Sequence, residues 1–421
     1  MNDDGPAIAT TGRTVGLSEM VRLGLYWFAT SFHWGALLTI VIPAEVLRFV
    51  PEDRKGSALG VLVAGGAVMA MLLAPIAGAL SDRSALPMGR RRPFVIVGVL
   101  VNCLGLIGLR YAPTFAWYVG AVLLVQAGNN FAGGAFNGLI PDRIPRDQRG
   151  TTSGVMGFMQ LLGTISGLAL SGALVGHGQT AAVYWVVAGI LLGGASVIVL
   201  GVHEEPPRQA VPFQLPQFVR SFWIDPRQHP DFAWVFVTRG LVMLGFYTLL
   251  TFLQFFLRDT LHFTVPKAAA ATAHLGVITI AAAALVALAA GWSSDWIGRK
   301  AIVSIAGGFL ALTSVGLLAH PPYSSLMWIA ALFGIGYGAY TSVDWALALD
   351  VLPSSRSAAK DLGIWGIANT LPQVLASSIG GPLLDAFNHR SPTLGYTIIF
   401  SIAIVYVVLG SILVWKIKGA R

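Results

Sequence analysis

An aspartate inside an apolar stretch is the first residue of this sequence that needs a chemical explanation. The stretch "GYGAYTSVDWALALD", residues 336–350, is apolar enough for a lipid bilayer, yet Asp344 lies inside it and Asp350 ends it. A charged residue at the centre of a membrane helix costs about 2.5 to 3.5 kcal/mol on insertion scales, so such residues face a wet cavity or a partner. Asp344 is therefore a candidate for a proton path.

Arg239 is the candidate partner of Asp344. If residues 233–257 and 325–349 cross the membrane in opposite directions, each charged residue lies about six residues, or roughly 9 Å, from the same face. The two would form either a structural ion pair or a switch in which Asp344 binds Arg239 and a proton alternately. The switch would couple protonation to a conformational change.

Further polar residues concentrate in a few of the apolar segments, at residues 21–43, 115–140, 233–257, 325–349 and 361–387. Amides offer both donors and acceptors to hydroxyl groups, and aromatic faces stack on flat ligands. The same groups also form hydrogen bonds between packed helices. The candidate binding residues are His33, Trp34, Asn129, Asn130, Asn137, Gln254, Tyr340, Asn369 and Gln373.

Two connecting loops carry an aspartate followed by basic residues, "GALSDRSALPMGRRRP" (78–93) and "GWSSDWIGRK" (291–300). Positive charge alone explains the arginines of a cytoplasmic loop but not its aspartates, because acidic residues contribute little to membrane orientation. We therefore expect a gating role for Asp82, Arg83, Arg90, Arg91, Asp295 and Arg299. Asp142, in "PDRIPRDQRG" (141–150), is a candidate for proton binding or gating.

The composition indicates that these residues are positioned by membrane helices. The chain has 55% hydrophobic and 11% charged residues, whereas soluble domains carry about 25% charged residues, and its mean hydropathy is +0.71. Helices of about 20 apolar residues cross the roughly 30 Å hydrocarbon core. The sequence predicts an all-α fold with spans at 21–43, 57–80, 93–110, 115–140, 152–176, 181–201, 233–257, 268–291, 301–319, 325–349, 361–387 and 393–415.

Charge and cysteine content restrict the possible partners and the location. The single cysteine, Cys103, allows no internal disulfide and suggests no metal site or cofactor. The net charge of +8 does not indicate nucleic acid, because 19 of the 27 basic residues fall on one side of the predicted topology. The positive-inside rule then places both termini in the cytoplasm. No signal peptide is recognised, and we expect a monomer in a bacterial-type inner membrane, surrounded by lipid.

The loop motifs repeat at half the length of the chain. Asp82 and Asp295 are 213 residues apart, and Asp142 and Asp350 are 208 apart. This spacing predicts two parallel six-helix repeats, with a substrate site between them near the membrane midplane. We expect the first half at residues 1–201, a Pro-rich and charged linker at 202–232, and the second half at 233–421.

These residues resemble those of a known family. The loop in which "SDR" precedes "GRRRPF" by five residues (81–94), "HWGALLTIVIP" and "GIANTLPQVLASSIGGPLLD" are similar to the sucrose-transporter branch of the major facilitator superfamily, related to glycoside–cation symporters. The resemblance implies a non-enzymatic secondary transporter that moves a disaccharide, oligosaccharide or glycoside with a proton, by alternating access. In that branch an arginine precedes the aspartate matching Asp142 by five residues; here that position is Asn137.

Two other functions remain open from the sequence. A proton-coupled exporter of a drug or metabolite would have the same fold, but such exporters usually carry a Gly-Pro pair in the fifth span, and "GTISGLALSGALVG" (163–176) has no proline. A non-transporting assembly factor for membrane pigment complexes would also share the fold. A solvent-accessible Arg239 and Asp344 would argue against the assembly factor.

Overall fold

Helices form nearly all of the chain that the computed structural model describes, which comprises residues 15–84, 86–145, 148–202, 204, 226–351 and 358–419. No strand occurs in these ranges, so the all-α prediction is confirmed. Ten of the helices are long and apolar enough to cross a membrane. Helices α5 (Phe115–Arg143) and α13 (Ala358–Arg390) are as long, but their amides and hydroxyls make them more polar.

Nine helical elements follow the six predicted segments of the first half, and several begin a few residues earlier than predicted. They are α1 (Leu17–Ala36), the π-helix η1 (Leu37–Val41), α2 (Ile42–Val46), the 3-10 helix η2 (Glu52–Arg54), α3 (Lys55–Asp82), α4 (Arg92–Arg110), α5, α6 (Arg149–Gly176) and α7 (Thr180–Gly201). The predicted first span, 21–43, is therefore three consecutive elements instead of one helix. Pro43 explains the break, since it lacks the N–H that a regular helix needs there.

The second half repeats the pattern. Its helices are α9 (Pro230–Thr260), α10 (Val265–Ile297), α11 (Arg299–Leu318), α12 (Tyr323–Asp350), α13 and α14 (Leu394–Leu413), followed by the 3-10 helix η5 (Val414–Lys416). The predicted linker, 202–232, lies mostly outside the described residues, and α9 begins inside its predicted range.

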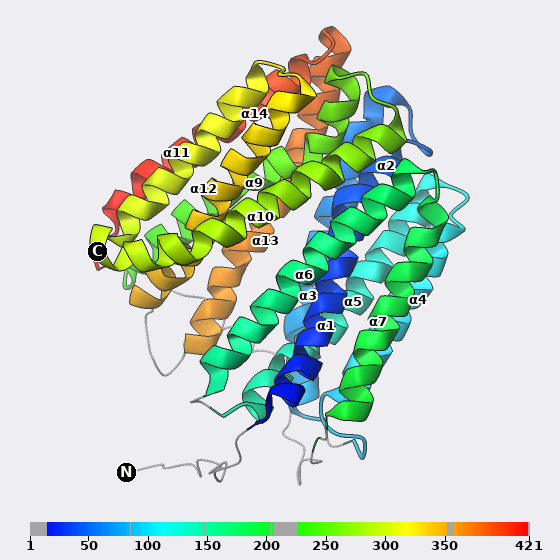
Figure 1. Cartoon of the computed structure of the whole chain (residues 1–421), viewed down its shortest axis with the longest axis vertical. Coiled ribbons are helices and arrows are strands. Elements are labelled where there is room, and N and C mark those ends of the chain that lie inside the picture. The colour runs from blue at the N-terminus through cyan, green and yellow to red at the C-terminus, as the bar shows by residue number, and fades with distance from the viewer. Residues whose placement is uncertain are drawn as a thin grey trace.

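The helices form two bundles whose axes diverge (Figure 1). Helices α1 to α7, blue to green, make the N-terminal bundle, and α9 to α14, light green to red, make the C-terminal bundle. We call the end at which α1 begins and α12 ends the inner end, and the end at which α3 begins and α9 ends the outer end. The bundles meet near the outer end and separate toward the inner end.

Close helix packing at the outer end depends on glycine. A Cβ atom on Gly60 of α3 would lie 2.5 Å from the carbonyl oxygen of Ser377 in α13, which no side chain tolerates. A Cβ on Gly172 of α6 would lie 2.2 Å from the Cβ of Ala273 in α10. Both contacts join one bundle to the other. Among the described residues, the hydrogen bonds and ion pairs between bundles also lie in this outer half.

Candidate functional site

A cavity of about 520 Å³ lies between the two bundles. Its walls come from α1, η1, α3, α5 and α6 on one side and from α9 to α13 on the other. This volume is typical of sites for small organic ligands, about 300 to 1,000 Å³. Within the described part of the chain, no Asp, Glu, Lys, Arg or His lines the cavity. The cavity therefore matches a neutral ligand better than a charged one.

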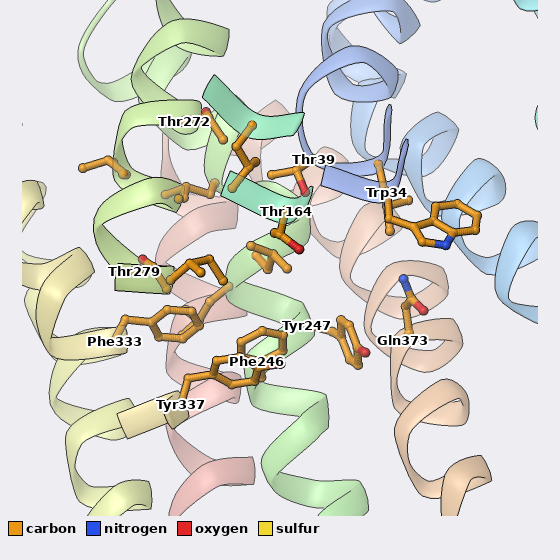
Figure 2. Close-up of a pocket in the computed structure, with 18 of the residues that line it drawn as sticks. Trp34, Thr39, Thr164, Phe246, Tyr247, Thr272, Thr279, Phe333, Tyr337 and Gln373 are labelled. Atoms are coloured by element: carbon orange, nitrogen blue, oxygen red, sulfur yellow. The ribbon is translucent and has the colours of Figure 1, made fainter. Parts of the chain in front are cut away.

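The N-terminal bundle supplies a polar wall. Gln126 and Asn130 of α5 are one turn apart, and the Asn130 Nδ2 donates to the Gln126 Oε1 at 3.1 Å. Gln160 and Thr164 have the same spacing on α6, which places both on one helix face. Trp34 of α1 also lines the cavity, and Figure 2 shows its indole ring. Amides, hydroxyls and one indole can thus meet a ligand from this side.

The C-terminal bundle supplies a flat aromatic wall. The ring of Phe246 on α9 stacks on Phe333 of α12 with centroids 5.2 Å apart and on Tyr337 with centroids 4.4 Å apart. These three rings lie together in Figure 2. At the edge of this surface, the Asn369 Nδ2 donates to the Tyr247 hydroxyl at 3.1 Å. A flat ligand face could stack here while its polar groups face the opposite bundle.

The ion pair expected between Arg239 and Asp344 is present in the structure. Arg239 lies seven residues before Phe246 on α9, and Asp344 lies seven residues after Tyr337 on α12. The ion pair and the Phe246–Tyr337 stack are thus two contacts between the same antiparallel helices, about 10 Å apart. The pair lies on the inner side of the cavity without lining it.

The environment of Asp344 is almost closed to solvent. Its side chain is 3% exposed and that of Arg239 is 11% exposed. The Tyr340 hydroxyl donates to the Asp344 Oδ1 at 3.1 Å. A carboxylate in such a place is stable because an arginine and a hydroxyl share its charge, and breaking a buried pair of this kind costs about 3 to 5 kcal/mol.

A second ionic cluster holds the inner end of the N-terminal bundle. The Arg91 guanidinium pairs with Asp82 at the end of α3 and, through Nε at 3.1 Å, with Asp142 of α5. Its Nη1 donates to the Ser81 Oγ at 2.7 Å, and its side chain is only 5% exposed. Arg90 also reaches Asp142, at 2.5 Å, from a more exposed position.

The comparisons with known proteins identify the family. The Major Facilitator Superfamily model matches residues 23–360, most of the chain. The chain belongs to this superfamily. It is accordingly a membrane transporter, not an enzyme. No curated protein sequence matches the chain significantly.

Two solved structures illustrate the shared superfamily fold. A variant of the nucleoside transporter NupG is 13% identical with a TM-score of 0.76, and the match covers 94% of this chain and 99% of that one. A bacterial homologue of the human lysosomal transporter Spinster, in an inward-facing and occupied conformation, is 16% identical with a TM-score of 0.72, covering 96% and 97%. At these identities the likeness shows the fold alone, and the sucrose-transporter branch is not established.

The superfamily repeat relates the inner ends of the two bundles. Arg299 pairs with Asp350 and donates to the Ala346 carbonyl at 2.6 Å. Arg91 and Arg299 are 208 residues apart, as are Asp142 and Asp350, so one arginine–aspartate pair occurs at the same place in both bundles. Arg83 donates to the Ala79 carbonyl at 2.7 Å. The side chain of Asp295 lies outside what the structure describes.

Four of the predicted binding residues line the cavity, namely Trp34, Asn130, Asn369 and Gln373. His33 and Asn129 do not, because they belong to a buried polar cluster inside the N-terminal bundle. The His33 Nε2 lies 3.3 Å from the Asn102 Nδ2, which lies 3.5 Å from the Asn129 Oδ1. This cluster joins α1, α4 and α5 inside the N-terminal bundle.

The other three predicted binding residues also lie outside the cavity. Asn137 is exposed near the inner end of α5. Tyr340 is buried against Asp344, and Gln254 is buried against the π-helix of the first span. Asp142, predicted for proton binding or gating, is held by Arg90 and Arg91 at the inner end.

Much of the cavity lining could not be recognised in the sequence, because threonines and aromatic residues are common in apolar helices. These missed residues include Thr39, Gln160, Thr164, Phe246, Tyr247, Thr272, Thr279, Phe333 and Tyr337. The one available signal was the four-residue spacing of Gln160 and Thr164, which places two polar groups on one face of an apolar helix.

A charged cluster at the outer end was also missed. The Lys55 Nζ lies 2.5 Å from the Asp259 Oδ2, which also accepts a bond from the Tyr396 hydroxyl at 2.6 Å. Asp385 of α13 accepts the backbone N–H groups of Gly56 and Ser57 at 2.8 and 2.7 Å. These N–H groups have no helical partner because α3 begins there. The outer end is therefore held shut by contacts between the bundles.

Proposed function

We propose that the chain is a proton symporter for a neutral sugar, such as a disaccharide, oligosaccharide or glycoside. The observation that carries this proposal is the uncharged cavity with amides on one wall and stacked rings on the other. Sugars carry many hydroxyls for the amides and present a flat C–H face to aromatic rings. The Arg239–Asp344 pair, on the inner side of this cavity, supplies the group that would exchange its arginine for a proton.

The proposal places the arginine-rich inner end in the cytoplasm, with both termini on that side of a bacterial inner membrane. Under this orientation the structure is inward-open, because the bundles are joined at the outer end and diverge at the inner end (Figure 1). The cycle then consists of loading from outside, closure of the outer end, and release to the cytoplasm.

The orientation is tested by labelling single cysteines in a Cys103→Ala background. Met88 lies at the inner end and Gln179 at the outer end, and both are exposed. In intact cells an impermeant maleimide should label Gln179→Cys and leave Met88→Cys unlabelled until the membrane is permeabilised. The reverse pattern would mean that the topology is inverted and that the structure is open to the outside.

The substrate class is tested by uptake into proteoliposomes, with and without an imposed pH gradient. The panel includes labelled disaccharides, aryl glycosides and nucleosides, the last because NupG is a nucleoside transporter. Uptake of a sugar driven by an inward proton gradient supports the proposal. If only nucleosides are taken up, the proposed sugar substrate is wrong. If the uptake rate does not depend on the pH gradient, the proposed proton symport is wrong.

The cavity wall is tested with two asparagines of the same helix. Asn130→Leu removes a lining amide, and we expect the half-saturation concentration to rise about tenfold, because one or two ligand hydrogen bonds are lost. Asn137→Leu removes an exposed amide outside the cavity and should change it less than about twofold. Equal effects of the two variants would mean that the ligand does not bind at this wall.

A further inference from the structure

The cavity has a roof where the first span loses its regular helix geometry. In η1 the Ile42 N–H donates to the Leu37 carbonyl, five residues earlier, which is the wide π register. Pro43 then has no N–H to give. Thr39 is four residues before Pro43, so in a regular helix its carbonyl would accept the bond that Pro43 cannot make. The break therefore leaves an acceptor in need of a donor.

Gln254 of the other bundle supplies that donor. With the amide oriented so that its nitrogen faces the break, the Nε2 donates to the Thr39 carbonyl at 3.1 Å and to the Ile40 carbonyl at 3.2 Å. In the opposite orientation the amide oxygen would face only acceptors, which fixes the assignment. The side chain is buried between the bundles. One neutral side chain of α9 thus bonds to two backbone carbonyls at the break in the first span.

The position of this contact makes it a closure of the cavity. Thr39 and Leu253 both line the cavity, and Ile40 and Gln254 are their next residues toward the outer end. The contact therefore lies between the cavity and the outer cluster of Lys55 and Asp259. A ligand that enters from the outer end cannot reach the cavity by this route while Gln254 remains bonded to the first span.

We propose that Gln254 is the outer latch of the cavity: its amide holds the bundles together through the carbonyls at the Pro43 break, and its release opens the outer end. The inference rests on the alternating access proposed above. Two neutral hydrogen bonds suit a latch that must open in every cycle, because water entering from outside satisfies both the amide and the carbonyls. In the open state water bonds to the freed carbonyls, so they are not left without hydrogen-bond donors.

The latch is tested by measuring the distance between two spin labels across the outer end. Gln179 and Ser391 are exposed outer-end residues on opposite bundles, and cysteines there in the Cys103→Ala background accept the labels. Gln254→Met keeps the length of the side chain but removes the donor. We expect the population ratio of the long-distance, outward-open state to the short-distance state to rise about tenfold.

Two further variants make the test specific. Thr248→Val removes a buried hydroxyl of the same helix that donates only to its own turn, at the Leu244 carbonyl, and should leave the distance distribution unchanged. Pro43→Ala restores an N–H that can bond the Thr39 carbonyl within the helix, so it should shift the ratio in the same direction as Gln254→Met. Combined with Gln254→Met it should add little, because both changes weaken the same contact between Gln254 and the first span.

An unchanged distance distribution in both Gln254→Met and Pro43→Ala would overturn the latch. The readout needs no substrate, so it is independent of the uptake assays. If no sugar is transported but the distances shift, the latch stands and the proposed function fails. If proton-driven uptake is found but the distances do not shift, the latch alone fails.

Discussion

Asp344→Asn is expected to abolish accumulation of substrate against a gradient while leaving exchange between equal compartments intact. Asparagine has the shape of the protonated aspartate but cannot change its charge. An exchange cycle needs no net proton movement, whereas accumulation does. With one proton per substrate, a gradient of one pH unit supports up to about tenfold accumulation in the unmodified protein, since a factor of ten corresponds to about 1.4 kcal/mol. The variant should reach a ratio of about one.

Both modes are measured in the same vesicles, with two controls. Tyr340→Phe removes the hydroxyl that donates to Asp344 but leaves the charge pair, so accumulation should persist. Arg239→Gln should be the harsher change, because it leaves a buried carboxylate that is relieved only by permanent protonation. If Asp344→Asn still accumulates substrate under a pH gradient, the carboxylate is structural and Asp142 becomes the next candidate for coupling.

The pair and the fold could be predicted from the sequence because both depend on signals along single helices. Long apolar segments predicted the helices. Arg239 and Asp344 are equally far from the ends of their predicted spans, which predicted the same depth for both in antiparallel helices, and the two residues do form an ion pair. Depth along a helix follows from a fixed rise per residue. Two charged residues at one depth in an apolar bundle have few other partners.

The wall of the cavity could not be predicted, because the depth of a residue along its helix does not determine the direction in which its side chain points. His33 and Trp34 are neighbours in α1, yet Trp34 lines the cavity while His33 is buried against Asn102. Successive residues on a helix point about 100° apart, so the choice depends on how the helix is rotated in its bundle. That rotation is set by tertiary packing, which an apolar helix without a polar stripe does not reveal.

Contacts between the bundles were the least predictable part. Gln254 was expected to bind substrate because it is an amide in an apolar span, but it bonds to the backbone of the first span. The clue in the sequence was Pro43. A proline predicts that the carbonyl four residues earlier lacks its helical donor, but it does not predict which residue donates to that carbonyl instead. Asp385 likewise serves the start of α3, more than 300 residues away. Such pairings depend on the relative placement of the two bundles.

Arg91→Met is expected to destabilise the protein strongly, while Arg90→Met is nearly neutral. The Arg91 side chain is 5% exposed and joins Asp82, Asp142 and Ser81, whereas that of Arg90 is 29% exposed and reaches Asp142 alone. Removing the buried arginine leaves two carboxylates close together and a buried hydroxyl without its donor.

Because both carboxylates can still reach water, we expect a loss of about 2 kcal/mol for Arg91→Met, less than the 3 to 5 kcal/mol of a fully buried pair. For Arg90→Met we expect less than about 1 kcal/mol, as for exposed ion pairs. The two variants remove the same charge one residue apart, so net charge and membrane orientation change equally. Thermal unfolding in detergent, followed by tryptophan fluorescence, compares them. If both lower the midpoint by the same amount, the effect comes from loop charge and not from the buried cluster, and Arg91 does not hold the inner end of the bundle.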